Sequence, residues 1–525
     1  MRVAADVGMA GSTGSGPSER ALAGARLRDL PLVVALLLPI AALGLQGPLG
    51  LGFYDEGFIW YGAQRVLAGE VPLRDFQSYD VGRYHWSAAW MFLAGDDGIL
   101  PFRMGNALLI ASTLAIVVWL IRSVPGRSVA LTLLATATVW LWMAPDFRAA
   151  DFFAPVVLVA GLSRLLETPS MPRRWAEYGV CYGLAAAIGI NHALYGCIGL
   201  VLAVALLVGL DRTCPTRRCW LALGAGMAAG YGPVLLLHAA VPDFTAAFID
   251  SMRILFEVRT TNLELPLPTR EPLALLFVAA PAFWLVCAAR IVRDRGGQRL
   301  RSRSGAVFAA AALLAVPYAH YALSRADVTH AVVSTLPLLV AAWTFPFKQP
   351  MWGRIGVLVL VLGSASLLPR QPAWAALAGD KLESVVVGST AMRVDPSVAM
   401  DLRLLKTLAE RHAPDGRTFY AAPYWPGAYA VLERRAPHWE IFALFPARPE
   451  RQRRELERLI EADIGFAVLS DWQVDGRVEL GLARTHPILF DHVRNCLDRI
   501  PLPVSAPSLD HLSAFVPTQR DCALP

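Results

Sequence analysis

The chain has 525 residues, of which 55% are hydrophobic and 17% charged, and its formal net charge is +6. An ordinary soluble chain is about 45–50% apolar and about 25% charged, so the composition excludes a disordered chain and argues against a soluble enzyme. The apolar excess lies in blocks between about residues 31 and 369, and the basic residues gather in the short loops between them. Basic loops of this kind orient a membrane protein and do not indicate a nucleic-acid partner. The sequence therefore predicts a polytopic α-helical membrane protein, at 31–369, with a soluble C-terminal domain at 370–525.

The apolar blocks predict eleven membrane spans, although a span needs about 20 residues and two of the blocks are shorter. The two short blocks are 154–166 and 176–190, and treating 176–210 as one broken helix would leave ten spans. Residues 1–30 are rich in Gly and Ser, which predicts a disordered tail and not the short n-region of a cleaved signal peptide. The predicted spans are 31–49, 104–121, 128–144, 154–166, 176–190, 194–210, 219–239, 272–290, 305–323, 328–345 and 352–369.

The distribution of basic residues between the loops selects one orientation. If the N-terminus is cytoplasmic, the inner segments carry 20 Arg and Lys residues and the outer segments 9, although the outer segments are longer in total. Because cytoplasmic loops carry the excess of positive charge, this orientation is favoured over its inverse. An odd number of spans then places the C-terminal domain outside the membrane.

A carboxylate pair opens the first outer loop, residues 50–103. Asp55 and Glu56 follow directly after the first span. Such a pair at the membrane surface can take a proton from a hydroxyl group or hold a divalent cation. It is equally typical of a solvated helix N-terminus, where acids are favoured. Neighbouring helical side chains point about 100° apart, so only one of the two can face a site well, and Asp55 is nearer the end of the span.

The same loop offers cationic candidates at Arg83 and His85. Arginine matches the geometry of a phosphate group. The alternative is interfacial anchoring, in which Trp86 and Trp90 form an aromatic belt beside them.

The second outer loop is short and contains Asp146, Arg148 and Asp151. Ionisable groups near a bilayer usually face a cavity and have partners. Either acid could supplement Asp55, and Arg148 could neutralise a phosphate leaving group. An ordinary polar turn is the alternative.

Two further polar groups lie at outer ends of predicted spans. Asn191 and His192 occupy the tight turn between the fifth and sixth spans, where a polar pair is costly unless it is satisfied. Arg325, Asp327 and His330 enter the tenth span, where a helix N-terminus itself favours an anion. All the candidate groups therefore share the outer face, whereas a secondary transporter keeps its ionisable groups near the midplane.

The C-terminal domain shows an α/β pattern. Residues 417–421 (RTFYA) and 464–470 (IGFAVLS) are predicted strands, and 451–462 is a predicted helix between them. Cys496 and Cys522 are 26 residues apart and are the cysteines of this domain. An oxidising outer compartment favours a disulfide between them, and two buried free thiols are the alternative.

Several of these stretches together resemble a known superfamily. They are YDEGFIWYGAQRVLAGEVPLRDF at 54–76, GRY at 82–84, the acidic second outer loop, and SRADVTHAVVSTLPLL at 324–339. They resemble the GT-C polytopic glycosyltransferases, in the bacterial branch related to protein mannosyltransferases and to the lipid A aminoarabinose transferase. The predicted layout of spans, long first loop and outer C-terminal domain resembles this superfamily too.

The resemblance implies an enzyme of the bacterial inner membrane, with a cytoplasmic N-terminus and a periplasmic C-terminal domain. It would take a hexosyl or pentosyl group from a polyprenyl-phosphate carrier and pass it, with inversion, to a lipid, glycan or protein acceptor of the envelope. The sugar, the carrier length, the acceptor and the oligomeric state are left open by the sequence. A secondary transporter and a non-catalytic envelope assembly protein are the alternative functions.

The resemblance also implies roles for the candidate residues. Asp55 or Glu56 would be the base, with Asp151 or Asp146 assisting. Relatives often carry a lysine where this chain has Asn191 and His192, so His192 would take that role as a hydrogen-bond donor or in its protonated form. No cofactor is required, and Asp55, Glu56 and Asp151 are the residues that would hold a divalent cation. The residues expected to bind the donor phosphate are Arg83, Arg148, His192, Arg325 and His330.

Overall fold

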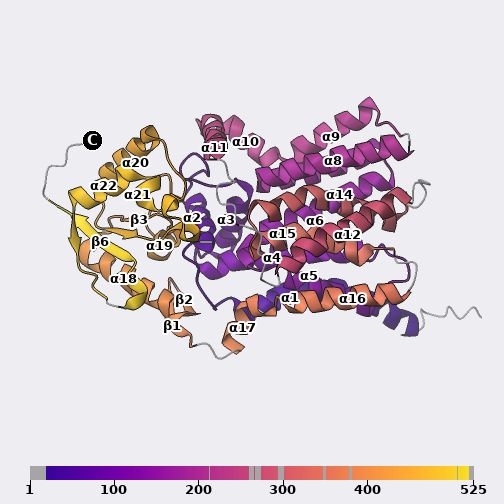
Figure 1. Cartoon of the computed structure of the whole chain (residues 1–525), viewed down its shortest axis with the longest axis horizontal. Helices are drawn as coiled ribbons and strands as arrows, with labels where there is room; N and C mark the ends of the chain where they lie inside the picture. The colour runs from indigo at the N-terminus through magenta and orange to yellow at the C-terminus, as the bar shows by residue number, and fades with distance from the viewer. Residues whose placement is uncertain are drawn as a thin grey trace, which may run out of the picture.

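A computed structural model describes residues 19–211, 213–258, 265, 273–293, 301–346, 350–377, 381–504 and 506–518. A bundle of long helices forms one half of the molecule, and the C-terminal domain forms the other (Figure 1). The first loop, residues 50–103, lies between the two halves. The fold class predicted from the sequence is therefore confirmed: a helical bundle followed by a small sheet-containing domain.

Each of the eleven predicted spans coincides in position with a helix or a helix pair of the bundle, and α11 (Phe244–Val258) matches no predicted span. The predicted span at 219–239 is two helices, α9 and α10, bent by 66° relative to each other. α1 begins at Glu19, so helix already starts inside the stretch predicted as a disordered tail, and residues 1–18 lie outside the described part of the chain. The bundle comprises α1 (Glu19–Gln46), α4 (Ile99–Ile121), α5 (Val129–Leu141), α6 (Ala149–Glu167), α7 (Pro172–Ile188), α8 (Ile190–Asp211), α9 (Arg217–Gly230), α10 (Gly232–Ala240), α11 (Phe244–Val258), α12 (Leu273–Arg293), α14 (Arg303–Ser324), α15 (Val328–Thr344) and α16 (Pro350–Ala365).

Seven helices among the described residues are long and apolar enough to cross a membrane, or eight if the bent pair α9–α10 is one span. Two shorter apolar helices, α5 and α15, fall below that length. The count of eleven thus stays a prediction, because it needs α5, α7 and α15 to span with 13, 17 and 17 helical residues.

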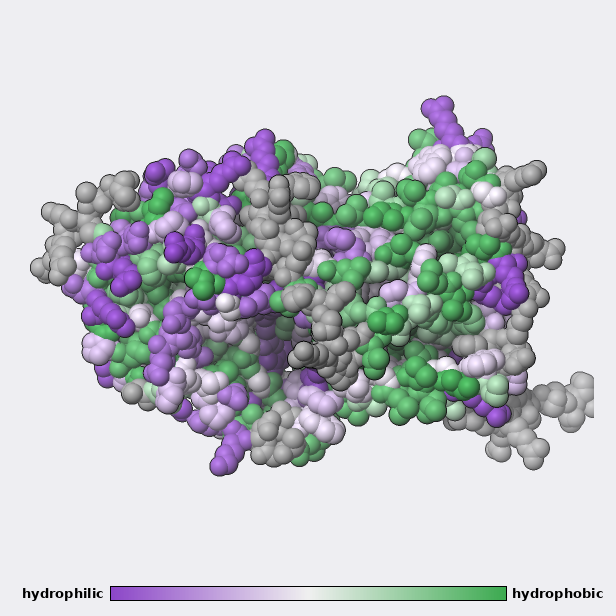
Figure 2. All heavy atoms as spheres, in the orientation of Figure 1, coloured by the Kyte–Doolittle hydropathy of each residue, from purple (hydrophilic) through white to green (hydrophobic). Residues whose placement is uncertain are grey.

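The surface of the bundle is apolar where that of the C-terminal domain is polar, as Figure 2 shows. Leu45, Leu236 and Leu275 are 74%, 68% and 73% exposed on bundle helices. A continuous surface of such side chains is typical of helices that are covered by lipid. The chain is therefore a multi-pass membrane protein.

Close helix packing inside the bundle depends on small residues. A Cβ atom added at Gly179 of α7 would lie 2.4 Å from the Leu223 carbonyl oxygen, and one added at Gly226 of α9 would lie 2.2 Å from that of Ala176. Small residues spaced by four positions let membrane helices approach this closely.

The first loop contributes α2 (Asp55–Leu67) and α3 (Gly82–Ala94). Phe58 and Tyr61 of α2 belong to the same hydrophobic core as Tyr429 and Phe442 of the C-terminal domain. The backbones meet at two glycines, since a Cβ atom at Gly57 would lie 2.4 Å from the Cα atom of Gly427. The first loop and the C-terminal domain thus share one packed core at the end of the bundle.

The described residues of the C-terminal domain form two small sheets. β1 and β2 form an antiparallel pair, and the larger sheet has the strand order β3-β4-β6-β5, in which β3 and β4 are parallel. The predicted strand–helix–strand order is confirmed by β3, α20 and β4. The elements are α17 (Pro372–Leu377), β1 (Glu383–Val387), β2 (Thr390–Val394), α18 (Pro396–His412), β3 (Tyr420–Ala422), α19 (Pro426–Leu432), α20 (Pro449–Glu461), β4 (Ala467–Ser470), α21 (Leu482–Thr485), α22 (Pro487–Cys496), β5 (Leu497–Ile500) and β6 (Leu512–Pro517).

Cys496, at the end of α22, takes part in a disulfide. Its expected partner, Cys522, lies outside the described residues, so the pairing stays a prediction.

Candidate functional site

The two adjacent carboxylates at the start of α2 have separate surroundings. Both oxygens of Glu56 accept hydrogen bonds from Arg103, at 2.8 and 2.9 Å, and one also accepts from the Gly52 amide at 2.9 Å. Arg103 donates in addition to the carbonyl groups of Gly47, Leu49 and Gly50. Glu56 therefore fixes the turn between α1 and α2, and its oxygens are occupied by that structural contact.

Asp55 is the first residue of α2, and its side chain is 44% exposed. The Tyr424 hydroxyl, from the C-terminal domain, donates to Asp55 Oδ1 at 2.7 Å. Arg148 Nη2 lies 3.4 Å from Asp55 Oδ2. The carboxylate thus lies between a tyrosine and an arginine and remains open to a ligand.

Arg148 joins Asp55 to a second acid. It precedes α6, and its Nη1 atom lies 3.5 Å from Asp151 in the first turn of that helix and 3.3 Å from the Tyr321 hydroxyl. Arg148 Nε is buried and has no hydrogen-bond partner among the described residues. A buried N–H without a partner is costly, so this arginine has an unused donor beside Asp55.

Arg83, in the first turn of α3, is fully engaged between two acids. Its Nε atom donates to Asp80 at 2.6 Å, and its Nη atoms donate to Asp151 at 3.3 and 3.1 Å. The Ile188 carbonyl accepts a further bond at 3.3 Å. Burial raises the pKa of Asp80 to about 6, although the Arg83 charge opposes that rise. Arg83 therefore links α3 to α6 through its ion pair with Asp151.

His192 completes the buried part of this network. Its Nε2 atom lies 3.2 Å from Asp151, and its Nδ1 atom lies 2.8 Å from the Tyr318 hydroxyl. The partners assign the tautomer: Nε2–H donates to the carboxylate and Nδ1 accepts from the tyrosine. His192 thus orients Asp151 from the start of α8.

Arg325 and His330 lie in a neighbouring cluster. Arg325 donates to both oxygens of Asp475 in the C-terminal domain, at 2.7 and 2.6 Å, and to Asp327 at 2.8 Å. His330 Nδ1 also contacts Asp327, at 2.9 Å, and its ring lies 5.0 Å from that of Tyr321. The structure thus brings five predicted residues into one network, namely Asp55, Arg83, Arg148, Asp151 and His192, and leaves Glu56, Arg325 and His330 outside it.

Four residues of the network were not predicted from the sequence, namely Asp80, Tyr318, Tyr321 and Tyr424. Asp80 lies three positions before Arg83, a spacing that could have indicated the pair. Tyr321 and Tyr424 had no such signal, since Tyr424 is 369 residues from Asp55.

The carboxylates proposed as metal ligands are each held by an arginine: Asp55 by Arg148, Glu56 by Arg103 and Asp151 by Arg83. Within the described ranges, no group of three or more His, Cys, Asp and Glu side chains is arranged to hold a metal ion.

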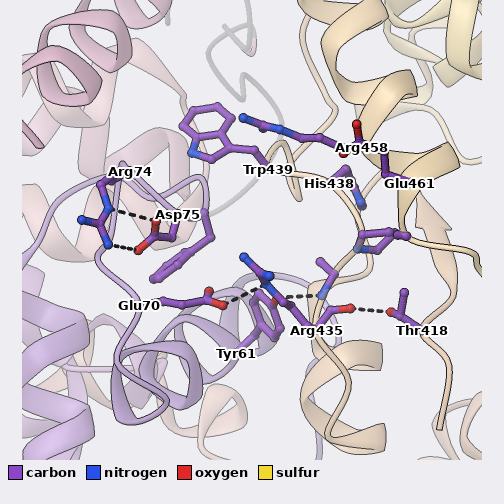
Figure 3. A pocket seen from close by; sticks show the side chains of 14 residues that line it. Tyr61, Glu70, Arg74, Asp75, Thr418, Arg435, His438, Trp439, Arg458 and Glu461 are labelled. Atoms are coloured by element: carbon purple, nitrogen blue, oxygen red, sulfur yellow. Dashed lines mark hydrogen bonds and ion pairs between the residues drawn. The ribbon is translucent and has the colours of Figure 1, made fainter. Parts of the chain in front are cut away.

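A separate cavity of about 400 Å³ lies between the first loop and the C-terminal domain (Figure 3). Arg74 and Glu70 line it from the first loop, and Arg435 and Trp439 line it from the domain. None of its lining residues belongs to the Asp55 network, so this cavity is separate from the Asp55 site.

No sequence-family model matches the chain, and no characterised protein matches it in sequence. The chain is similar in structure to ArnT from Cupriavidus metallidurans in the apo state, with a TM-score of 0.52 and 14% identity over 94% of this chain and 98% of that one. It is equally similar to ArnT from the same organism bound to undecaprenyl phosphate, with a TM-score of 0.52 and 13% identity over 95% and 99% of the two chains. The predicted resemblance is therefore confirmed: the chain has the GT-C fold.

Proposed function

We propose that the protein is a membrane glycosyltransferase that moves a sugar from a polyprenyl-phosphate carrier to an acceptor of the bacterial cell envelope. The observation that carries this proposal is the pairing of a half-exposed carboxylate, Asp55, with an arginine, Arg148, that has an unused buried donor. A hydroxyl acceptor needs a base, and a phosphate leaving group needs a cation. The structural similarity to ArnT bound to undecaprenyl phosphate supports a lipid-phosphate donor.

In the proposed reaction, Asp55 takes the proton of the acceptor hydroxyl as its oxygen bonds to the anomeric carbon of the sugar. The bond between that carbon and the phosphate oxygen breaks, and its electron pair leaves with polyprenyl phosphate. Attack from the face opposite the phosphate inverts the anomeric carbon. Arg148 stabilises the leaving phosphate, while Arg83 and His192 hold Asp151, which positions Arg148.

The remaining predicted roles follow from these contacts. Glu56 would act on the geometry of α2 and not on the substrate. Arg325 and His330 would reach the phosphate only after giving up contacts with Asp475 or Asp327, so we assign them a positioning role. The site would face the periplasm, with the N-terminus in the cytoplasm, as the basic residues of the loops indicate.

The two alternatives lack a specific observation in their favour. A transporter would hold its acids in a closed cavity near the midplane, whereas the Asp55 side chain is 44% exposed at the start of a helix outside the bundle. A non-catalytic assembly protein would need no exposed acid. It would also be expected to have its first loop packed shut against the C-terminal domain, whereas an open cavity lies between them beside their shared core.

The test is an assay of the purified protein with a panel of polyprenyl-phosphate sugars and an extract of envelope glycans and lipids as acceptors. We expect one donor to release polyprenyl phosphate with the wild-type protein, and release at least about 100-fold slower with Asp55→Asn. Release at the wild-type rate by Asp55→Asn, or no release from any donor, would contradict the proposal.

A further inference from the structure

Asp55 separates two chemically different surfaces. On one side lies Arg148, with Asp151 and Arg83 behind it. On the other side lie aromatic side chains from both halves of the molecule, beginning with Tyr424, whose hydroxyl donates to Asp55. If the donor phosphate lies against the cations, then the acceptor must approach from the aromatic side.

Two of these aromatic side chains are exposed at the surface, and we call them the aromatic rim: Tyr54 is 43% exposed and Trp472 37%. The ring of Tyr54 lies 5.9 Å from that of Tyr424 and 5.8 Å from that of Trp472, with which it is stacked at 29°. One rim residue thus comes from the first loop and the other from the C-terminal domain.

Hydrogen bonds fix the backbone of the segment that carries Trp472. The Trp472 amide donates to Ser470 Oγ at 3.0 Å, and the preceding Asp471 amide donates to the His511 carbonyl at 2.9 Å. Three residues later, Asp475 adopts a left-handed backbone conformation, with φ of 56°, and both of its oxygens accept from Arg325. The ion pair between the two halves of the molecule therefore fixes Trp472 opposite the start of α2.

The charge around the rim selects among ligands. Asp55 follows Tyr54 in the chain, and its carboxylate accepts from Tyr424, the ring next to Tyr54. A carboxylate at this position disfavours an anionic ligand at the rim. Exposed tyrosine and tryptophan faces instead suit a ring with an apolar C–H face and a polar edge, because the aromatic face carries partial negative charge.

We propose that the aromatic rim is the acceptor subsite and that it binds an uncharged pyranose ring by stacking, so that the acceptor is a glycan. This inference rests on the proposed function for the direction of transfer. It gives the C-terminal domain a part in acceptor choice through Trp472, and it makes Arg325 and Asp475 positioning residues for that side chain.

The test measures binding without any lipid donor, so it is independent of turnover. The full-length protein in lipid nanodiscs, free of sugar detergents, is examined by saturation-transfer NMR with the methyl glycosides of glucose, galactose, mannose and N-acetylglucosamine. We expect saturation transfer to at least one glycoside, a loss of at least fivefold in Trp472→Ala and in Tyr54→Leu, and recovery in Trp472→Phe. Trp374→Ala is the matched control, since Trp374 of α17 is 44% exposed and lies on a helix beside α1.

Three outcomes would overturn the inference: no glycoside binds, binding survives both Trp472→Ala and Tyr54→Leu in folded protein, or Trp374→Ala loses it equally. Once a donor is known, Trp472→Ala should raise KM for the acceptor and leave KM for the donor unchanged, and the reverse result would also overturn it. Glycoside binding at the rim without any release of polyprenyl phosphate would support the subsite and contradict the proposed transferase.

Discussion

Two neighbouring carboxylates at the start of α2 lie in regions with opposite character. The Glu56 region is closed: Arg103 holds both carboxylate oxygens, and the two side chains are only 12% and 11% exposed. The Asp55 region is open: its arginine contact is longer, at 3.4 Å, and the side chain is 44% exposed. The comparison teaches that a 100° turn of the helix is enough to separate a structural acid from a candidate catalytic one.

The most direct way to break this comparison is to remove each charge in turn. We expect Asp55→Asn to lower the transfer rate by about 100-fold to 10,000-fold, the range for loss of a general base, with an unchanged unfolding midpoint. Glu56→Gln is the matched control. Its main effect should be a lower unfolding midpoint, with a smaller loss of transfer rate than in Asp55→Asn. Polyprenyl-phosphate release and thermal unfolding measure both; equal losses of rate in the two variants would remove the distinction.

The arginines provide a second contrast. Arg148→Gln should lower the transfer rate by about 100-fold to 1,000-fold, as for other groups that stabilise developing charge, because a leaving phosphate loses its cation. Arg148→Lys should recover part of that rate, since lysine keeps the charge but not the planar fork. The comparison is of kcat at saturating donor. A full rate in Arg148→Gln would show that the phosphate is stabilised elsewhere.

The closed region should respond in stability. We expect Arg103→Ala to lower the free energy of unfolding by about 3 kcal/mol, because it leaves the Glu56 carboxylate without its partner in a mostly buried site. The double variant Glu56→Gln with Arg103→Ala should lose less than the sum of the two single variants. Denaturant unfolding of the full chain measures each value, and strict additivity would mean that the pair is not coupled.

The surroundings of Asp55 include Tyr424 of the C-terminal domain. The contact between Gly57 and Gly427 offers a test of whether the transfer rate depends on that domain. A Cβ atom at Gly427 would lie 2.7 Å from the Cα atom of Phe53. We expect Gly427→Ala to cost about 1–3 kcal/mol through overpacking and to lower the transfer rate by displacing Tyr424. Gly224→Ala of α9 is a control in open space, since no heavy atom would lie within 4 Å of a Cβ atom there. A rate that is unaffected by Gly427→Ala would separate the site from the domain.

The smallest effect concerns Asp401, an acid near Tyr54 whose pKa burial raises to about 7. The folded state then binds a proton that the unfolded chain releases near pH 4, so this contribution to stability is present below about pH 4 and is lost as the pH rises to about 7. Asp401→Asn removes the penalty on the buried charge. Its gain in unfolding midpoint should therefore be larger at pH 8 than at pH 4, and an equal gain at both would contradict the assignment.

The sequence alone determined the features that arise from local composition. Apolar blocks and basic loops predicted the helical bundle, because transfer of apolar side chains into lipid depends on each segment by itself. The strand–helix–strand order of the C-terminal domain was also readable from short stretches, and so was the choice of Asp55, Arg148 and Asp151 as candidate site residues. The pattern could not separate Asp55 from Glu56, because their difference lies in which of them Arg103 holds.

Only the tertiary structure decided which distant side chains complete the site. Tyr424 reaches Asp55 across 369 residues, and Trp472 lies against Tyr54 in the segment whose Asp475 binds Arg325. Arg325 and His330 were grouped with the phosphate ligands because they share an outer helix end, but their partners lie in the C-terminal domain and in Asp327. Contacts of this kind have no sequence period, since they arise where two separately folded surfaces meet.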